Sequence, residues 1–192
     1  MSQSWPSTPT PPAPGEYALD ASHTRVGFVA RHLMVTKVSG DFKKVDAVIR
    51  IGASPAESSV EAVIQIASVD TNDQKRDDHL RSADFFDAAA FPTMTFRSTR
   101  VERAGGDHYK VTGDLTIRDQ THPVTLDVEY AGAAKTPWGS VAAGITASGE
   151  IERERWGLGW NVALESGGVL VSKKIQLEIE AEIVAVAAVA AA

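Results

Sequence analysis

The sequence predicts an all-β fold: an antiparallel sheet of about eight strands that closes on itself as a barrel, with one short helical insertion. Apolar and polar residues alternate with a period of two along most of the chain from Tyr17 onward. Clusters of glycine, proline and polar residues separate the alternating segments, as hairpins require. One apolar face and one wet face, repeated along the chain, are typical of an antiparallel sheet.

The alternating segments follow one another in chain order, and each places its apolar residues on one face. These residues are, segment by segment, Val26, Phe28 and Ala30; Val60, Ala62, Ile64 and Ile66; Met94 and Phe96; Val111, Leu115 and Ile117; Val124, Leu126, Val128 and Tyr130; and Val169, Val171, Ile175, Leu177, Ile179 and Ile183. Turns are expected at 52–55, 104–106, 119–122 and 132–137. Closure into a barrel buries the apolar faces and removes exposed edges, and an eight-stranded interior is either filled or holds one small ligand.

Residues 71–91 break the alternation and predict a short helix over about 72–81. Thr71 and Gln74 form a T-x-x-Q capping box, although Asn72 or Asp73 is also a suitable cap. Asp77 and Arg81 stand four residues apart, as helical ion pairs do. A loop with Phe85, Phe86 and Phe91 follows the helix. A long insertion between two barrel strands is expected to be a lid or a functional loop.

Composition bounds the class of protein. The chain has 192 residues, of which 43% are hydrophobic, and this suits one globular domain. Its formal net charge of −6, with both signs interspersed, argues against a nucleic-acid partner. The absence of cysteine excludes disulfides, thiolate metal sites and cysteine nucleophiles.

The two ends of the chain are expected to lie outside the domain, which we place at residues 16–184. Residues 1–15 contain five of the nine prolines and predict a disordered, proline-rich arm without the features of a secretory signal. Residues 185–192 form an alanine-rich tail, and the apolar run that ends there is far shorter than the roughly 20 residues of a membrane span. We therefore expect a cytoplasmic protein without a membrane span.

No motif for catalysis or metal binding stands out. The five histidines form no H-x-x-x-H pair, and the adjacent Asp77, Asp78 and His79 would diverge on a helix. G-x-S-x-G is absent, and Val162 occupies the position where a dinucleotide-binding motif after Gly157 and Gly159 would need glycine. We expect no catalytic residues, no metal and no cofactor.

The aromatic residues and the small residues together favour an apolar cavity. Alanine and glycine occupy several inward positions, which argues that side chains do not fill the barrel; they are Ala30, Ala62, Ala143, Ala147 and Gly149. His32 follows the inward face of its strand, where it would either pair with another polar group or meet a ligand headgroup. Both interpretations of His32 stay open.

Four segments resemble the YceI-like family of polyisoprenoid-binding, lipocalin-like proteins. They are DASHTRVGFVARHLMVTKVSGDF, RDDHLRSADFFDAAAFPTMTF, VTGDLTIRDQTHPVTLDV and WGLGW, in family order over about residues 17–183. The resemblance implies an extended eight-stranded antiparallel barrel whose lumen holds a long isoprenoid or similar amphiphile. It also implies contacts to the ligand, or positions in the lid, at Phe28, His32, Phe42, Arg76, His79, Leu80, Phe85, Phe86, Met94, Phe96 and Trp160. A structural clasp on the lumen is the alternative role of the R-D-x-H-L block. Many relatives carry an export signal, and this chain departs from them there.

Three hypotheses follow. The first is a non-enzymatic protein that carries, stores or senses a polyprenyl diphosphate, quinone or fatty amide, with Arg76, His79 and His32 near its polar end. The second is a lipid-metabolising isomerase or hydrolase that uses the same cavity. The third is a ligand-free module with a filled core that forms a homodimer.

Overall fold

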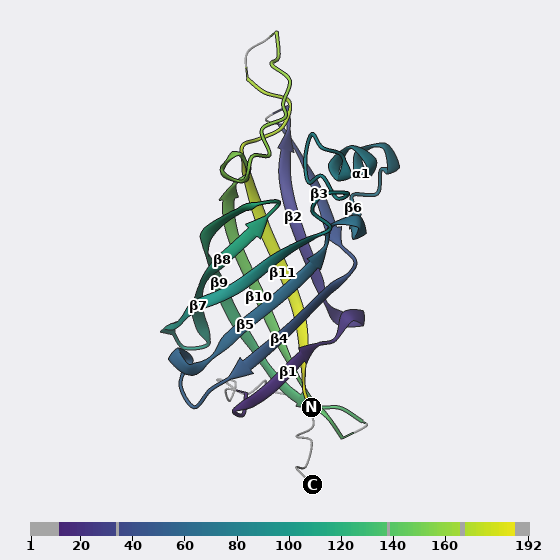
Figure 1. Ribbon diagram of the computed structural model, residues 1–192. Helices are drawn as coiled ribbons and strands as arrows, with labels where there is room; N and C mark the ends of the chain where they lie inside the picture. The colour runs from purple at the N-terminus through teal and green to yellow at the C-terminus, as the bar shows by residue number, and fades with distance from the viewer. Residues whose placement is uncertain (1–11, 34, 138, 166–167, 187–192) are drawn as a thin grey trace, which may run out of the picture.

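The chain folds into an antiparallel barrel, seen in a computed structural model that describes residues 12–33, 35–137, 139–165 and 168–186 (Figure 1). In the described part the strands are β1 (Gly15–Leu19), β2 (Arg25–His32), β3 (Thr36–Phe42), β4 (Val45–Ile51), β5 (Ser59–Gln65), β6 (Val69–Asp70), β7 (Thr93–Gly105), β8 (His108–Ile117), β9 (Gln120–Lys135), β10 (Val141–Glu152) and β11 (Lys174–Ala185). The α-helix is α1 (Gln74–Arg81), and the short 3₁₀ helices are η1 (Ala21–His23), η2 (Pro55–Glu57), η3 (Ile66–Ser68) and η4 (Arg153–Trp156).

Eight strands close the barrel. They follow one another in the order β1, β4, β5, β7, β8, β9, β10 and β11, and the pairing of β1 with β11 completes the ring. β2 pairs with a different part of β11 from β1, β3 pairs with β2, and β6 pairs with β3. β1–β2, β3–β4 and β5–β6 are therefore three long strands, each interrupted once. The predicted closed barrel of about eight strands with one short helix is confirmed.

The interruptions have local causes in the polar residues at each break. At η1 the Asp20 carboxylate accepts a hydrogen bond from the backbone N–H of Ser22 at 2.9 Å and so caps the 3₁₀ turn. Between β3 and β4, the backbone N–H groups of Lys43 and Lys44 donate to the carbonyl and hydroxyl oxygens of Ser68, which belongs to η3. The breaks of two neighbouring strands thus satisfy each other's backbone groups, and the wall bends there.

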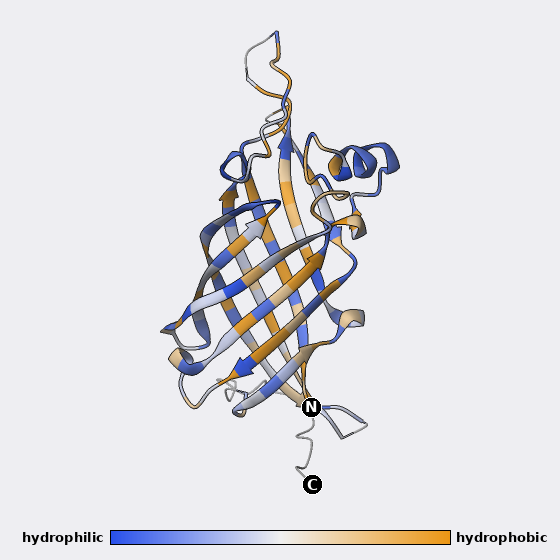
Figure 2. Cartoon of the chain, viewed as in Figure 1, coloured by the Kyte–Doolittle hydropathy of each residue, from blue (hydrophilic) through white to orange (hydrophobic). Residues whose placement is uncertain are grey.

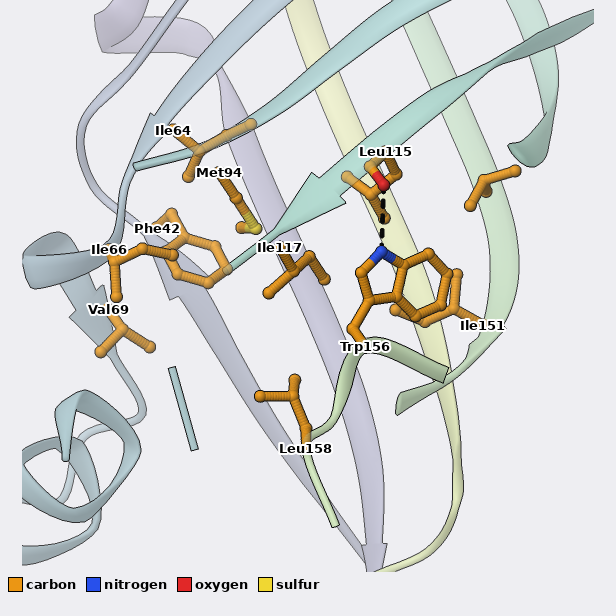
Figure 3. Packing of buried hydrophobic residues seen from close by; sticks show 11 residues of the cluster. Phe42, Ile64, Ile66, Val69, Met94, Leu115, Ile117, Ile151, Trp156 and Leu158 are labelled. Atoms are coloured by element: carbon orange, nitrogen blue, oxygen red, sulfur yellow. Dashed lines mark hydrogen bonds between the residues drawn. The ribbon is translucent and has the colours of Figure 1, made fainter. Parts of the chain in front are cut away.

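Hydrophobic and hydrophilic residues alternate along many of the strands (Figure 2), and apolar side chains line the interior of the barrel. Trp156 of η4 lies in the larger cluster of buried residues with an exposed fraction of 1%, and its indole N–H donates to the carbonyl oxygen of Leu115 at 3.0 Å (Figure 3). A second cluster, around Tyr17, Ile49 and Tyr130, joins β1, β4, β9 and the ends of β10 and β11. The two clusters lie in different parts of the barrel and leave space between its walls.

The helix α1 has a different cap from the one that the sequence favoured. Asp73, not Thr71, is the N-cap, and its carboxylate accepts from the backbone N–H of Arg76 at 3.1 Å. Asp77 is 5% exposed and accepts from both the backbone N–H and the hydroxyl of Thr71, at 2.9 and 2.6 Å. Arg81 pairs with the exposed Asp78 at 3.0 Å. The predicted capping box and the Asp77–Arg81 pair are wrong because Asp77 faces the barrel and bonds Thr71.

The buried carboxylate of Asp77 is expected to hold the helix on the barrel. Replacing it in Asp77→Ala leaves two donors of Thr71 without their acceptor and should lower the free energy of unfolding by about 1–3 kcal/mol. Asp78→Ala, on the exposed side of the same helix, should change it by about 0.5 kcal/mol or less. Urea unfolding of both variants measures the difference, and equal losses would contradict the role of Asp77.

Candidate functional site: the barrel lumen

The barrel encloses an apolar cavity of about 300 Å³, which we call the lumen. Its volume falls at the lower end of the range of ligand pockets in proteins. Every strand except β6 contributes to its wall, together with Leu80 of α1 and the loop that follows this helix. Arg153 is the one charged residue in a wall that is otherwise made of apolar side chains and Gly27. Such a lumen offers dispersion and hydrophobic contact but little polar recognition.

The space exists because small side chains face inward on neighbouring strands. Ala47 of β4 and Ala62 of β5 lie opposite each other in the strand register, and both line the lumen. Ala30, Ala147 and Ala181 line it as well.

Two other small residues that the sequence placed along the cavity have different surroundings. Ala143 is buried in the cluster with Tyr17 and Tyr130. Gly149 lies beneath Leu126, since a Cβ atom there would come within 2.8 Å of the Leu126 methyl carbon. Inward direction alone therefore does not bring a small residue to the lumen.

Two phenylalanines line the lumen while lying against glycines of the adjacent strand. Phe28 lies directly opposite Gly40, and a Cβ atom at Gly40 would come within 2.6 Å of its ring. A Cβ atom at Gly113 would come within 2.5 Å of the Phe96 ring. Glycine at these two positions lets the rings lie close to the wall, and this keeps the middle of the barrel open.

Aromatic and aliphatic side chains close the end of the lumen beside α1. Leu80, Phe85 and Phe86 line the cavity from this segment. The ring of Phe86 lies edge-on to Phe42 with centroids 5.8 Å apart, and Phe42 lies 5.7 Å from Phe28. The helical insertion therefore places apolar side chains against this end of the lumen, and its role as a lid stays a prediction.

His79 and Trp160 lie behind this cap. The imidazole is edge-on to both Trp160 and Phe85, at 4.6 and 5.0 Å between ring centroids, and its Nε2 lies 2.9 Å from a carboxylate oxygen of Asp84. Trp160 is half-buried, and neither residue lines the lumen.

Of the other two polar candidates, Arg76 is hydrogen-bonded to protein atoms and His32 is exposed. Arg76 donates to the hydroxyl and carbonyl oxygens of Thr71, at 2.7 and 2.8 Å. His32 is exposed at the end of β2, where it forms an isolated bridge with Val171, so the expectation that it points inward is not met. Ala30 lines the lumen, whereas His32, two residues further along β2, does not.

The structure thus divides the predicted ligand contacts into two groups. Seven line the lumen: Phe28, Phe42, Leu80, Phe85, Phe86, Met94 and Phe96. His32, Arg76, His79 and Trp160 do not. All the apolar candidates except Trp160 share one cavity, and the three polar candidates lie outside it.

The sequence analysis missed Arg153, which closes one part of the wall. Arg153 is 3% exposed, and its guanidinium donates to the carbonyl oxygens of Ser172, Leu158 and Trp160, the first at 2.9 Å and the last at 3.0 Å. Burial lowers the pKa of Arg153 below its usual range. The signal was present in the sequence, because Arg153 continues the inward alternation of Ala147 and Ile151.

The carbonyl contacts of Arg153 are expected to need a guanidinium. Arg153→Lys keeps the charge but loses the planar set of donors, so the free energy of unfolding should fall by about 2–3 kcal/mol. Arg155→Lys changes an exposed arginine in the same turn and is the matched control, with an expected change below about 0.5 kcal/mol. Chemical denaturation compares the two, and a stable Arg153→Lys protein would show that these bonds contribute little.

Comparison with known proteins agrees with this geometry. The YceI-like domain matches residues 17–183. The chain belongs to the YceI-like family. A UPF0312 protein of Staphylococcus aureus is 38% identical over 169 residues, which cover 86% of this chain and 95% of that protein. The resemblance noted in the sequence is confirmed.

Solved structures share the YceI-like barrel. BcnA of Burkholderia cenocepacia matches with a TM-score of 0.74 and 27% identity, over 88% of this chain and 99% of that one. A polyisoprenoid binding domain from Saccharophagus degradans, implicated in plant cell wall breakdown, matches with a TM-score of 0.65 and 15% identity, over 88% and 98% of the two chains. Residues 1–11 of the predicted arm and 187–192 of the predicted tail lie outside the described residues. Among the helices of the described part, none has the length and apolar character to cross a bilayer.

Proposed function

We propose that this YceI-like protein binds a long-chain isoprenoid or a related amphiphile in the lumen and carries, stores or senses it without chemical change. The observation that carries the proposal is the cavity of about 300 Å³ with an apolar wall and an apolar cap. The seven apolar contacts predicted from the sequence are the proposed ligand-binding residues. The resemblance to the polyisoprenoid binding domain of S. degradans supports the fold of such a binder.

Burial of the chain supplies the driving force. Each buried methylene contributes about 0.8 kcal/mol, so a chain of 15 carbons gains on the order of 10 kcal/mol before the cost of ordering. Discrimination by chain length should be weak, because one methylene more or less in an apolar pocket changes binding by only about 1–3 kcal/mol. A family of chain lengths is therefore the expected ligand set.

The two alternative functions have less support. An enzyme would need polar groups aimed at the lumen, whereas Asp77 and His79 are bonded to Thr71 and Asp84. A ligand-free module would need a filled barrel, whereas the lumen holds open space. The cytoplasmic location and the homodimer stay predictions from the sequence.

Organic extraction of the purified native protein, followed by mass spectrometry, tests the proposal directly. We expect a prenyl or long alkyl compound at a stoichiometry near one per chain. A clean extract from a protein that also fails to take up prenyl diphosphates, quinones and fatty amides would contradict the proposal.

A variant that fills the lumen sharpens this test. Ala62→Phe adds a ring inside the cavity and should weaken uptake of a prenyl chain at least about tenfold, because the ring occupies the space of several methylenes. Val63→Phe places the same ring on the neighbouring, 39% exposed position of β5 and should leave uptake unchanged. Circular dichroism verifies that both variants fold, and equal uptake by both would place the ligand elsewhere.

A further inference from the structure

A second cavity, of about 430 Å³, lies at the end of the barrel away from α1, and we call it the floor cavity. The turn that contains η2 and the hairpin between β7 and β8 surround it, at the lower left of Figure 1. Five apolar residues line both the floor cavity and the lumen: Ile49, Val60, Val111, Val128 and Ile145. The two spaces therefore adjoin each other at these five residues.

Tyr130 lines the floor cavity and does not line the lumen. Its side chain is 4% exposed, yet within the described residues its hydroxyl has no hydrogen-bond partner. The buried Tyr17, in the same cluster, does have a partner, because its hydroxyl donates to the carbonyl oxygen of Ala13 at 2.8 Å. A buried polar group without a partner is rare, and a functional role is one of the physical reasons for it.

Arg103 lines the same cavity and carries a charge without an opposite charge. Its Nε donates to the carbonyl oxygen of Gly106 at 2.9 Å, and no carboxylate of the described chain lies within 4.0 Å of its guanidinium. Arg103 lies opposite Tyr109 in the strand register, and Tyr109 also lines the cavity. The exposed Arg103 and the buried Tyr130 thus line the same cavity.

The phenol of Tyr130 stays protonated over the ordinary pH range. Burial, with smaller contributions from Tyr17 and Tyr109, raises the pKa of Tyr130 above its usual value. A protonated phenol can donate its hydrogen to an oxygen of a ligand. The floor cavity therefore offers a neutral donor and a cation, and both favour an oxygen with negative charge.

The end beside α1 offers no comparable groups. Arg76 and Arg81 donate to protein oxygens there, and His79 lies within hydrogen-bond distance of Asp84. Arg153 donates to backbone carbonyl oxygens from the wall of the lumen. Among the described residues, two buried side-chain polar atoms have no partner, the hydroxyls of Thr24 and Tyr130, and of these two residues only Tyr130 lines the floor cavity.

We propose that the floor cavity binds the polar end of the amphiphile, with an anionic carboxylate or phosphate oxygen that accepts hydrogen bonds from Tyr130 and Arg103. This inference rests on the proposed function and adds the orientation of the ligand. Its chain lies in the lumen with the tail toward Leu80 and Phe85. The ligand class is a long-chain acid or prenyl phosphate. The inference replaces the expectation that Arg76, His79 and His32 receive the headgroup.

The experiment compares a chain that has a headgroup with the same chain without one. Farnesyl diphosphate and farnesene are titrated into the full-length protein, and the dissociation constants are measured from the change in tryptophan fluorescence. Tyr130→Phe removes the hydroxyl alone and should weaken farnesyl diphosphate about tenfold while farnesene is unchanged. Arg103→Gln should weaken farnesyl diphosphate similarly and reduce the salt dependence of its binding.

A stability measurement separates ligand binding from a structural role. Tyr130→Phe removes a buried polar group without a partner, so the Tm of the ligand-free protein should stay the same or rise by a few degrees. Tyr17→Phe is the matched control: its ring lines neither cavity, and both ligands should keep their affinity. A lower affinity together with a retained Tm is not expected of a residue that only supports the fold.

The outcomes distinguish this inference from the proposed function. If farnesene binds but Tyr130→Phe and Arg103→Gln leave farnesyl diphosphate unchanged, the headgroup site is wrong and the chain-binding function stands. If His79→Ala weakens farnesyl diphosphate selectively, the polar end lies beside α1 and the inference is overturned. If neither compound binds the native protein, the proposed function fails and the inference fails with it.

Discussion

The pairing of β1 with β11 is the contact on which the rest of the structure depends. Tyr17 and Leu19 lie opposite Ala185 and Ile183, and this short ladder closes eight strands into a ring. Without it the barrel would present two unpaired edges and an open apolar face. Because η1 interrupts the first long strand, β1 and β2 share one edge of β11 in series. Closure therefore takes place although β1 is only five residues long.

Once the barrel is closed, the size of the inward side chains determines how much open space remains inside it. Eight strands set the width of the barrel, and the inward side chains decide how much of that width is used. Alanines at positions such as 47 and 62, and glycines that let Phe28 and Phe96 lie near the wall, leave the middle open. The lumen is thus a consequence of small residues at particular points of a closed sheet.

The two ends of the barrel have different chemistry. At the α1 end, Thr71, Asp77 and Arg76 form a chain of hydrogen bonds that attaches the helix, while phenylalanines cap the lumen. At the other end, the floor cavity is lined by Tyr130, whose hydroxyl has no partner among the described residues, and by Arg103, whose Nε donates to the carbonyl oxygen of Gly106. An amphiphile has the same asymmetry, since one end is apolar and the other is polar. In α1, Arg76, Asp77 and Arg81 form hydrogen bonds to other protein atoms, and the polar site is proposed far from them.

The sequence by itself determined the strands, the approximate place of the helix and the apolar wall, because alternation and capping are local properties of a few neighbouring residues. It did not determine which polar groups find partners. A bulge in β7 between Ser98 and Arg100 shifts the strand register. Before it the even-numbered Phe96 lines the lumen, and after it the odd-numbered Val101 and Arg103 line the floor cavity. Simple alternation therefore does not predict that Arg103 lines this cavity. The bond of Arg153 to the carbonyl oxygen of Ser172, and the lack of a partner for the Tyr130 hydroxyl among the described residues, likewise depend on the tertiary structure. Only the tertiary structure decides these, because hydrogen-bond satisfaction inside a barrel depends on which residues the register brings face to face.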